Sequence, residues 1–176
     1  TAVIAARQVV VEPELAQFCL SPGCAQYGLS KSCPPHVAGP EAFQAWLNDF
    51  QTAMVVKIEV PSQVLMSDER LEVFGLLHHL VAGVERAAIA QGYKRARAFA
   101  GGSCKQIFCH QHTDCRVVDR QDHCRNPQFA RPSMSGFGVN VGRLMQLAGW
   151  QMKKITRDTD PVKVPLGTLV GLILID

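Results

Sequence analysis

Apolar residues recur at helical spacing in three parts of the chain. Residues 40–50 begin with Pro40, which the first turn of a helix tolerates, and carry four large apolar side chains on one face. Residues 67–92 repeat the pattern over a longer stretch and end at Gly92, a frequent helix stop. Residues 138–150 show the same spacing once more. The sequence therefore predicts three helices, the second of them long.

Three other segments have the composition of strands. Residues 53–60 are mostly apolar and end at Pro61, residues 95–100 alternate, and residues 168–176 form a last apolar run. The first two flank the long predicted helix, and an order of strand, helix, strand favours a right-handed crossover between parallel strands. The expected fold is α/β: a small single domain with a mixed or parallel sheet, flanked by helices and carrying two cysteine-rich loops.

Two irregular stretches, residues 19–40 and 101–127, hold all the cysteines of the chain. The first is rich in Gly, Pro and Ser, and the second follows directly from the predicted strand at residues 95–100. The candidate ligands are Cys19, Cys24 and Cys33 in the first stretch and Cys104, Cys109, Cys115 and Cys124 in the second.

Composition limits the role of these cysteines. A chain of 176 residues with 47% hydrophobic residues can bury a core without disulfides, so we expect one domain over residues 1–176. Seven cysteines is an odd number, and a complete set of disulfides would leave one thiol over. The count favours a reducing cytosol and metal ligation.

Charge and hydropathy argue against several partners. The formal net charge is only +3, and the basic residues are scattered apart from residues 93–97, which argues against nucleic-acid binding. The N-terminal residues lack the basic start and long apolar run of a signal peptide, and the apolar run at residues 169–175 is too short to span a bilayer. We expect a cytoplasmic protein without membrane insertion.

The spacing of the cysteines favours an iron–sulfur cluster over zinc. The gaps are four and eight residues in the first stretch and four, five and eight in the second, without the CxxC pair common in structural zinc sites. A four-iron cluster is larger than one ion and accepts ligands from wider loops. Prolines follow Cys33 and Cys124 at short distance, as in ferredoxin-type sites. Zinc, and cysteines that are unligated or form disulfides, remain the alternatives.

The first stretch supplies only three cysteines. The fourth ligand of a cluster there would be His36, another side chain, water or a substrate, and an open iron position is where a cluster does Lewis-acid or reductive chemistry. Convergence of all seven cysteines on one site is the other possibility. His110, His112 and His123 lie between the later cysteines and are candidate ligands or proton carriers.

Other residues have a structural and a functional interpretation. Arg131 follows the last cysteine and either donates to a cluster sulfur or pairs with a carboxylate. His78 and His79 lie in the long predicted helix, where we expect one to face inward and the other outward. Residues 136–142, "GFGVNVG", do not follow a predicted strand, so they indicate a helix start rather than a dinucleotide site.

The sequence "CLSPGCAQYGLSKSCPP" at residues 19–35, and "GGSCKQIFC" with the later "CRNPQFARPSMSGFGVNV" within residues 101–141, resemble the motifs of an uncharacterised prokaryotic family. Its members are labelled predicted metal-binding proteins and are often met in anaerobes. The resemblance extends from residue 19 to the end of the chain. It implies metal or iron–sulfur binding at all seven cysteines and no settled reaction. The family's second cluster commonly begins with a tighter C-x2-C-x2-C run than the gaps of four and five found here.

We therefore predict an iron–sulfur protein with two [4Fe–4S] clusters, acting in electron transfer in a cytoplasmic redox pathway, with anaerobic metabolism implied by the resemblance. Its partner would be a redox protein, and the chain would act alone or as a subunit of a larger complex. One alternative is an enzyme of reductase or lyase type that uses an open iron at the three-cysteine site. The other alternative is a zinc-binding interaction module.

Overall fold

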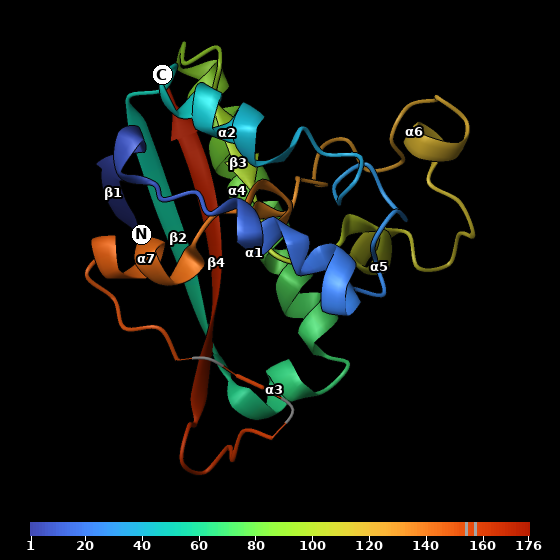
Figure 1. Cartoon of the computed structure of the whole chain (residues 1–176), viewed down its shortest axis with the longest axis vertical. Coiled ribbons are helices and arrows are strands. Elements are labelled where there is room, and N and C mark those ends of the chain that lie inside the picture. Colours follow the sequence, from blue (N-terminus) through green and yellow to red (C-terminus); the bar gives the residue numbers. More distant parts are fainter. Residues whose placement is uncertain (154, 157) are drawn as a thin grey trace.

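Four strands form one sheet in the order β1-β2-β4-β3, in which each neighbouring pair is antiparallel (Figure 1). The computed structural model describes residues 1–153, 155–156 and 158–176. The strands are β1 (Ala2–Ala5), β2 (Thr52–Pro61), β3 (Arg97–Phe99) and β4 (Leu166–Ile175). The last three correspond to the predicted strands, and β1 is a strand that the sequence pattern does not predict.

The three predicted helices are confirmed. They are α2 (Gly39–Leu47), α4 (Arg70–Ala90) and α7 (Val141–Leu147). The side chain of Asn140 accepts a hydrogen bond from the Arg143 N–H and caps α7, so the "GFGVNVG" segment does lead into a helix. The structure adds short elements: α1 (Pro13–Gln17), α3 (Ser62–Met66), α5 (Cys104–Phe108), α6 (Arg116–Asp119), η1 (Ala6–Gln8), η2 (Cys19–Gly23) and η3 (Met134–Phe137).

The expectation of a mixed or parallel sheet is wrong. β2, α4 and β3 follow one another along the chain as predicted, but β4 lies between the two strands and pairs antiparallel with both. β4 occupies this central place because its residues from Leu169 to Leu174 are all buried and need cover on both faces. An apolar run predicts a buried strand but does not identify its neighbours.

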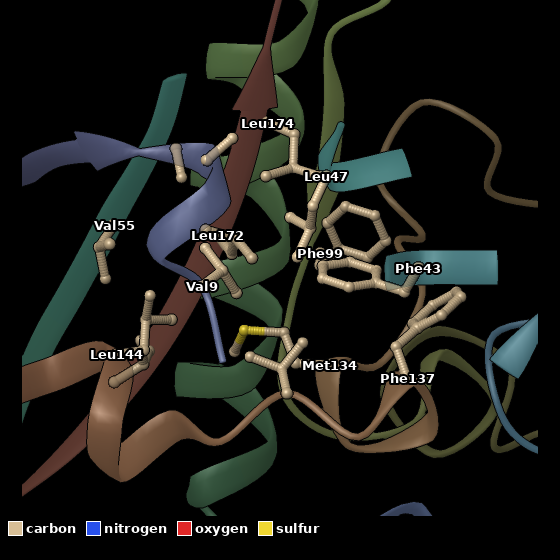
Figure 2. Close-up of a cluster of buried hydrophobic side chains, with 14 of the residues drawn as sticks. Val9, Phe43, Leu47, Val55, Phe99, Met134, Phe137, Leu144, Leu172 and Leu174 are labelled. Carbon is tan, nitrogen blue, oxygen red and sulfur yellow. The ribbon is translucent and has the colours of Figure 1, made fainter. Parts of the chain in front are cut away.

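The sheet separates two hydrophobic cores. On one face, α2, α7 and η3 contribute to the larger core, in which Phe43, Phe99 and Phe137 pack ring against ring (Figure 2). On the other face, α4 packs on the sheet through Leu77 and Val81. The fold is therefore a three-layer α/β domain with β4 at its centre.

Gly171 in β4 allows α4 to lie close to the sheet. A Cβ atom at this position would lie 2.4 Å from Cγ1 of Val81 and 3.2 Å from Cδ1 of Leu77. The absence of a side chain at this one position therefore sets the distance between the helix and the sheet.

The helix α4 is long and apolar. Its 21 residues, with a mean hydropathy of 1.3 in the most apolar window, would suffice to cross a membrane by length and composition alone. In the structure one side of α4 covers the sheet, and its Glu85 pairs with Arg131. This arrangement is that of a core helix with one packed face.

Both cysteine-bearing segments lie on the same side of the molecule, where the blue residues after α1 approach the gold residues around α5 and α6 (Figure 1). β3 leads through Ala100 and two glycines into α5, as predicted. Ala100 donates a backbone hydrogen bond to Pro132 and accepts one from Met134. Ser133 in turn donates to the Ser32 carbonyl oxygen, 2.9 Å away. The second cysteine-bearing segment therefore continues directly from β3, and the hydrogen bond from Ser133 connects the first segment to the same region.

Candidate metal centre

Four cysteines line one narrow cavity, and we call them the second cysteine group. Cys104 is the first residue of α5, and Cys109 directly follows that helix. Cys115 directly precedes α6, and Cys124 lies in the loop beyond it. Ser30 from the other segment completes one wall of the cavity. Two short helices thus bring together thiols that are far apart in the sequence.

Hydrogen-bond donors point at three sulfurs of the second cysteine group. The side-chain amide of Asn126 lies 3.3 Å from Sγ of Cys109, and its backbone nitrogen lies 3.4 Å from Sγ of Cys124. The Ser32 hydroxyl donates to Sγ of Cys104 at 3.1 Å. Such donors stabilise a thiolate, and around an iron–sulfur cluster they tune the reduction potential.

Three cationic side chains also line the cavity: Lys105, Arg116 and Arg125. Nζ of Lys105 donates to the carbonyl oxygens of Cys109, at 2.9 Å, and of His112. Arg125 lies 2.7 Å from Asp114, and its hydrogen bond lowers the pKa of that carboxyl below the usual value. Lys105 therefore places positive charge beside the thiols, whereas the charge of Arg125 is paired with Asp114.

The partly buried position of Cys104 perturbs its thiol. Burial raises the pKa of Cys104 to about 11, although the hydrogen bond from Ser32 lowers it. Negative charge on Cys33 and Cys124 raises this pKa further. The free thiol therefore stays protonated at neutral pH, and a bound metal must displace its proton.

The first cysteine group consists of Cys19, Cys24 and Cys33, which lie in one loop. The N–H of Cys24 donates to the Cys19 carbonyl oxygen at 3.0 Å. Gly28, with a φ of +77°, donates to the Pro34 carbonyl oxygen and turns the chain back toward Cys33. Burial, and then the charges of Cys24 and Cys33, raise the pKa of the Cys19 thiol. The three thiols are therefore close enough for their charges to interact.

The first cysteine group opens onto a groove. Cys24 is exposed, Cys33 is buried, and Cys19 is intermediate. Nε2 of His36, the histidine considered as a fourth ligand, lies 3.0 Å from the Gly28 carbonyl oxygen. Apolar side chains line the groove beside Cys19 and Cys24, namely Leu15, Phe18, Val139, Val141 and Met152. Water or a small molecule would reach these two thiols through the groove.

The donor atoms fit a soft metal or a cluster. All seven cysteines are free thiols. Within residues 1–153, 155–156 and 158–176, no three His, Cys, Asp or Glu side chains lie close enough together to hold a single metal ion. The second cysteine group is instead spread around a shared cavity with cationic walls. Thiolates prefer zinc, copper(I) or iron–sulfur clusters to hard cations such as magnesium.

The histidines near the later cysteines are not among the residues that line the cavity of the second cysteine group. His110, His112 and His123 are exposed. His78 is fully buried, and His79 is exposed, as predicted for two consecutive residues of a packed helix. Nε2 of His78 lies 3.2 Å from the Gly101 carbonyl oxygen.

Arg131 pairs with a carboxylate, which is one of its two predicted roles. Its Nη2 lies 2.5 Å from Oε2 of Glu85, and its Nη1 donates to the carbonyl oxygens of Pro127 and Ala130. These contacts fix the end of the second cysteine segment to α4.

Sequence reasoning missed the donors that contact the sulfurs. These are Ser32, from the first segment, and Asn126. Ser32 directly precedes Cys33, and Asn126 follows Cys124 by two residues. Closeness to a cysteine in the sequence was therefore an available signal.

An α/β domain that gathers seven free thiols in two neighbouring loops has the features of a metal-binding protein. The chain belongs to the family described as predicted metal-binding protein (DUF2284), whose family model matches residues 2–175. The resemblance seen in the cysteine motifs is thereby confirmed. No curated protein and no solved structure matches the chain.

Proposed function

We propose that the protein is an iron–sulfur protein that transfers single electrons, with one [4Fe–4S] cluster at each cysteine group. The observation that carries the proposal is the second cysteine group. Its four thiols line one cavity, and hydrogen-bond donors from Ser32 and Asn126 contact three of the sulfurs. A four-iron cluster holds its thiolates further apart than zinc does, so this arrangement and the wide sequence gaps support the cluster.

The residues around the second cysteine group have complementary roles in this proposal. A cluster held there supplies reversible one-electron chemistry. Ser32 and Asn126 donate to the sulfurs, and Lys105 places positive charge beside them. Arg116 lines the cavity and is exposed, which favours an acidic redox protein as the partner. We place this pathway in the cytoplasm.

The groove beside the first cysteine group favours a second candidate function, an enzyme of reductase or lyase type. Only three thiols are present there, and the groove exposes Phe18 at 60% and Met152 at 49%. A small apolar substrate with one donor atom fits this environment. If the protein is such an enzyme, its absorption or EPR spectrum should change when a small apolar substrate is added. If it is only an electron carrier, the spectrum should stay the same.

The test is the iron and acid-labile sulfide content per chain of protein purified without oxygen, with an EPR spectrum of the dithionite-reduced sample. Two clusters give about eight iron and eight sulfide per chain. A content of about four would leave one cysteine group with another role. Zinc without sulfide would overturn the proposal in favour of a zinc-binding interaction module.

A further inference from the structure

Ser32 is a point of contact between the two cysteine groups. It directly precedes Cys33, and its hydroxyl donates to Sγ of Cys104 at 3.1 Å. Sγ of Cys33 lies 3.8 Å from the same hydroxyl oxygen. Ser32 is 6% exposed and Cys33 is 7% exposed, so bulk water does not compete strongly for this hydroxyl. One buried side chain therefore reaches a sulfur of each group.

Two further buried hydroxyls continue from Ser32. Oγ of Ser30 lies 3.0 Å from Oγ of Ser32 and 3.4 Å from Oγ of Ser103. A hydroxyl has one proton to donate, and that of Ser32 is directed at Cys104. Ser30 then donates to Ser32, and Ser103 donates to Ser30. The three hydroxyl dipoles align toward the sulfur and strengthen one another.

The backbone holds Ser32 in this position. Ser133 donates to the Ser32 carbonyl oxygen at 2.9 Å, and the N–H of Cys104 lies 3.4 Å from the Ser32 hydroxyl oxygen. Because one contact comes from the backbone of Ser133 and the other from the backbone of Cys104 itself, the hydroxyl and the Cys104 sulfur stay together.

We propose that Ser32 is a positioning residue that raises the reduction potential of the site formed by the second cysteine group. The inference rests on the proposed iron–sulfur function. A hydrogen bond to a ligand sulfur favours the reduced site because it stabilises the added negative charge. Reduction by a one-electron donor adds an electron and breaks no bond.

The test is the midpoint potential of this site, from a redox titration followed by EPR. Ser32→Ala should shift the potential to a lower value while iron and sulfide per chain stay unchanged. Ser32→Thr keeps a hydroxyl and should return the potential toward the wild-type value. Ser103→Ala is the matched control, because its buried hydroxyl contacts Ser30 and should shift the potential less. The same titrations in a Cys24→Ser background assign the signal to the second cysteine group.

The outcomes separate this inference from the proposed function. If the wild-type protein contains no iron and sulfide, the proposed iron–sulfur function is overturned before any serine variant is made. Intact clusters with an unchanged potential in Ser32→Ala, or equal shifts in Ser32→Ala and Ser103→Ala, would overturn the inference alone. If Ser32→Ala loses its cluster, the potential of Ser30→Ala replaces it as the test. This substitution leaves the Ser32 hydroxyl in place and removes only the hydroxyl that donates to it. A smaller downward shift then supports the inference, and no shift overturns it.

Discussion

Arg131, which is buried, and Glu85, which is partly buried, form an ion pair in which Nη2 of the arginine lies 2.5 Å from Oε2 of the glutamate. Oε1 of the same glutamate accepts a hydrogen bond from the backbone N–H of Ala98 in β3 at 2.6 Å. One carboxylate on α4 therefore holds both the strand that leads into the second cysteine group and the chain that leaves it.

Glu85→Gln should lower the free energy of unfolding by about 3 kcal/mol, because it leaves the Arg131 guanidinium buried without its counter-charge. Urea unfolding measures the change. Asp68→Asn is the matched control, since Asp68 pairs with Arg70 at the surface and its loss should cost less than about 1 kcal/mol. Equal effects of the two substitutions would show that burial does not determine the strength of the Glu85 pair.

His78 holds the same region from the inside of α4. Its Nδ1 accepts a hydrogen bond from the Arg131 N–H at 3.1 Å, and its Nε2 lies 3.2 Å from the Gly101 carbonyl oxygen. A neutral ring with its proton on Nε2 satisfies both contacts. Burial lowers the pKa of His78 from 6.5 to about 4.

This shift predicts a loss of stability in acid. Between pH 6.5 and pH 4 the unfolded chain binds a proton at His78 that the folded chain does not, so folding weakens as the pH falls. The neutral His78 ring contributes its full share to the free energy of unfolding above pH 6.5. About 2 kcal/mol of that free energy is lost at pH 5. Urea unfolding at pH 7.5 and pH 5 measures the loss, which should be about 2 kcal/mol smaller in His78→Gln. The same pH dependence in both proteins would contradict the prediction.

Gly171→Ala should lower the free energy of unfolding by about 2 kcal/mol, because the new Cβ would lie 2.4 Å from Cγ1 of Val81 in the packed interface of α4 and β4. Gly83→Ala, in α4 itself, is the control. A Cβ at Gly83 meets nothing within 4 Å, and alanine is the better helix former, so stability should stay the same or rise. Thermal unfolding compares the two variants, and similar losses in both would show that the close approach at Gly171 is not the cause.

Substitutions in the two cysteine groups should act separately. If each group holds its own cluster, Cys24→Ser and Cys115→Ser should each retain about half of the iron and sulfide of the wild-type protein. Metal and sulfide analysis of both variants, purified without oxygen, measures this. Complete loss of iron from either variant would favour a single site shared by all seven cysteines.

The metal-binding class of the protein was within reach of its sequence. Cys19, Cys24 and Cys33 stand in a stretch without periodicity, and their spacing with Pro34 carried the resemblance to the family. Ser32 and Asn126 lie near cysteines in the sequence, which was a signal for a role at the site, but the sequence does not show which sulfur each of them contacts. The contact of Ser32 with Cys104, for example, spans 72 residues.

The sequence by itself determined the helices α2, α4 and α7, the strands β2, β3 and β4, and which cysteines fall into each of the two stretches. These features depend on residues that are near one another in the chain, where periodicity and spacing are visible. Only the tertiary structure decided that β4 lies between β2 and β3, that Arg131 pairs with Glu85, and that the two cysteine groups meet at Ser32. Such contacts depend on which buried faces pack together, and packing of distant segments leaves no periodic signal in the sequence.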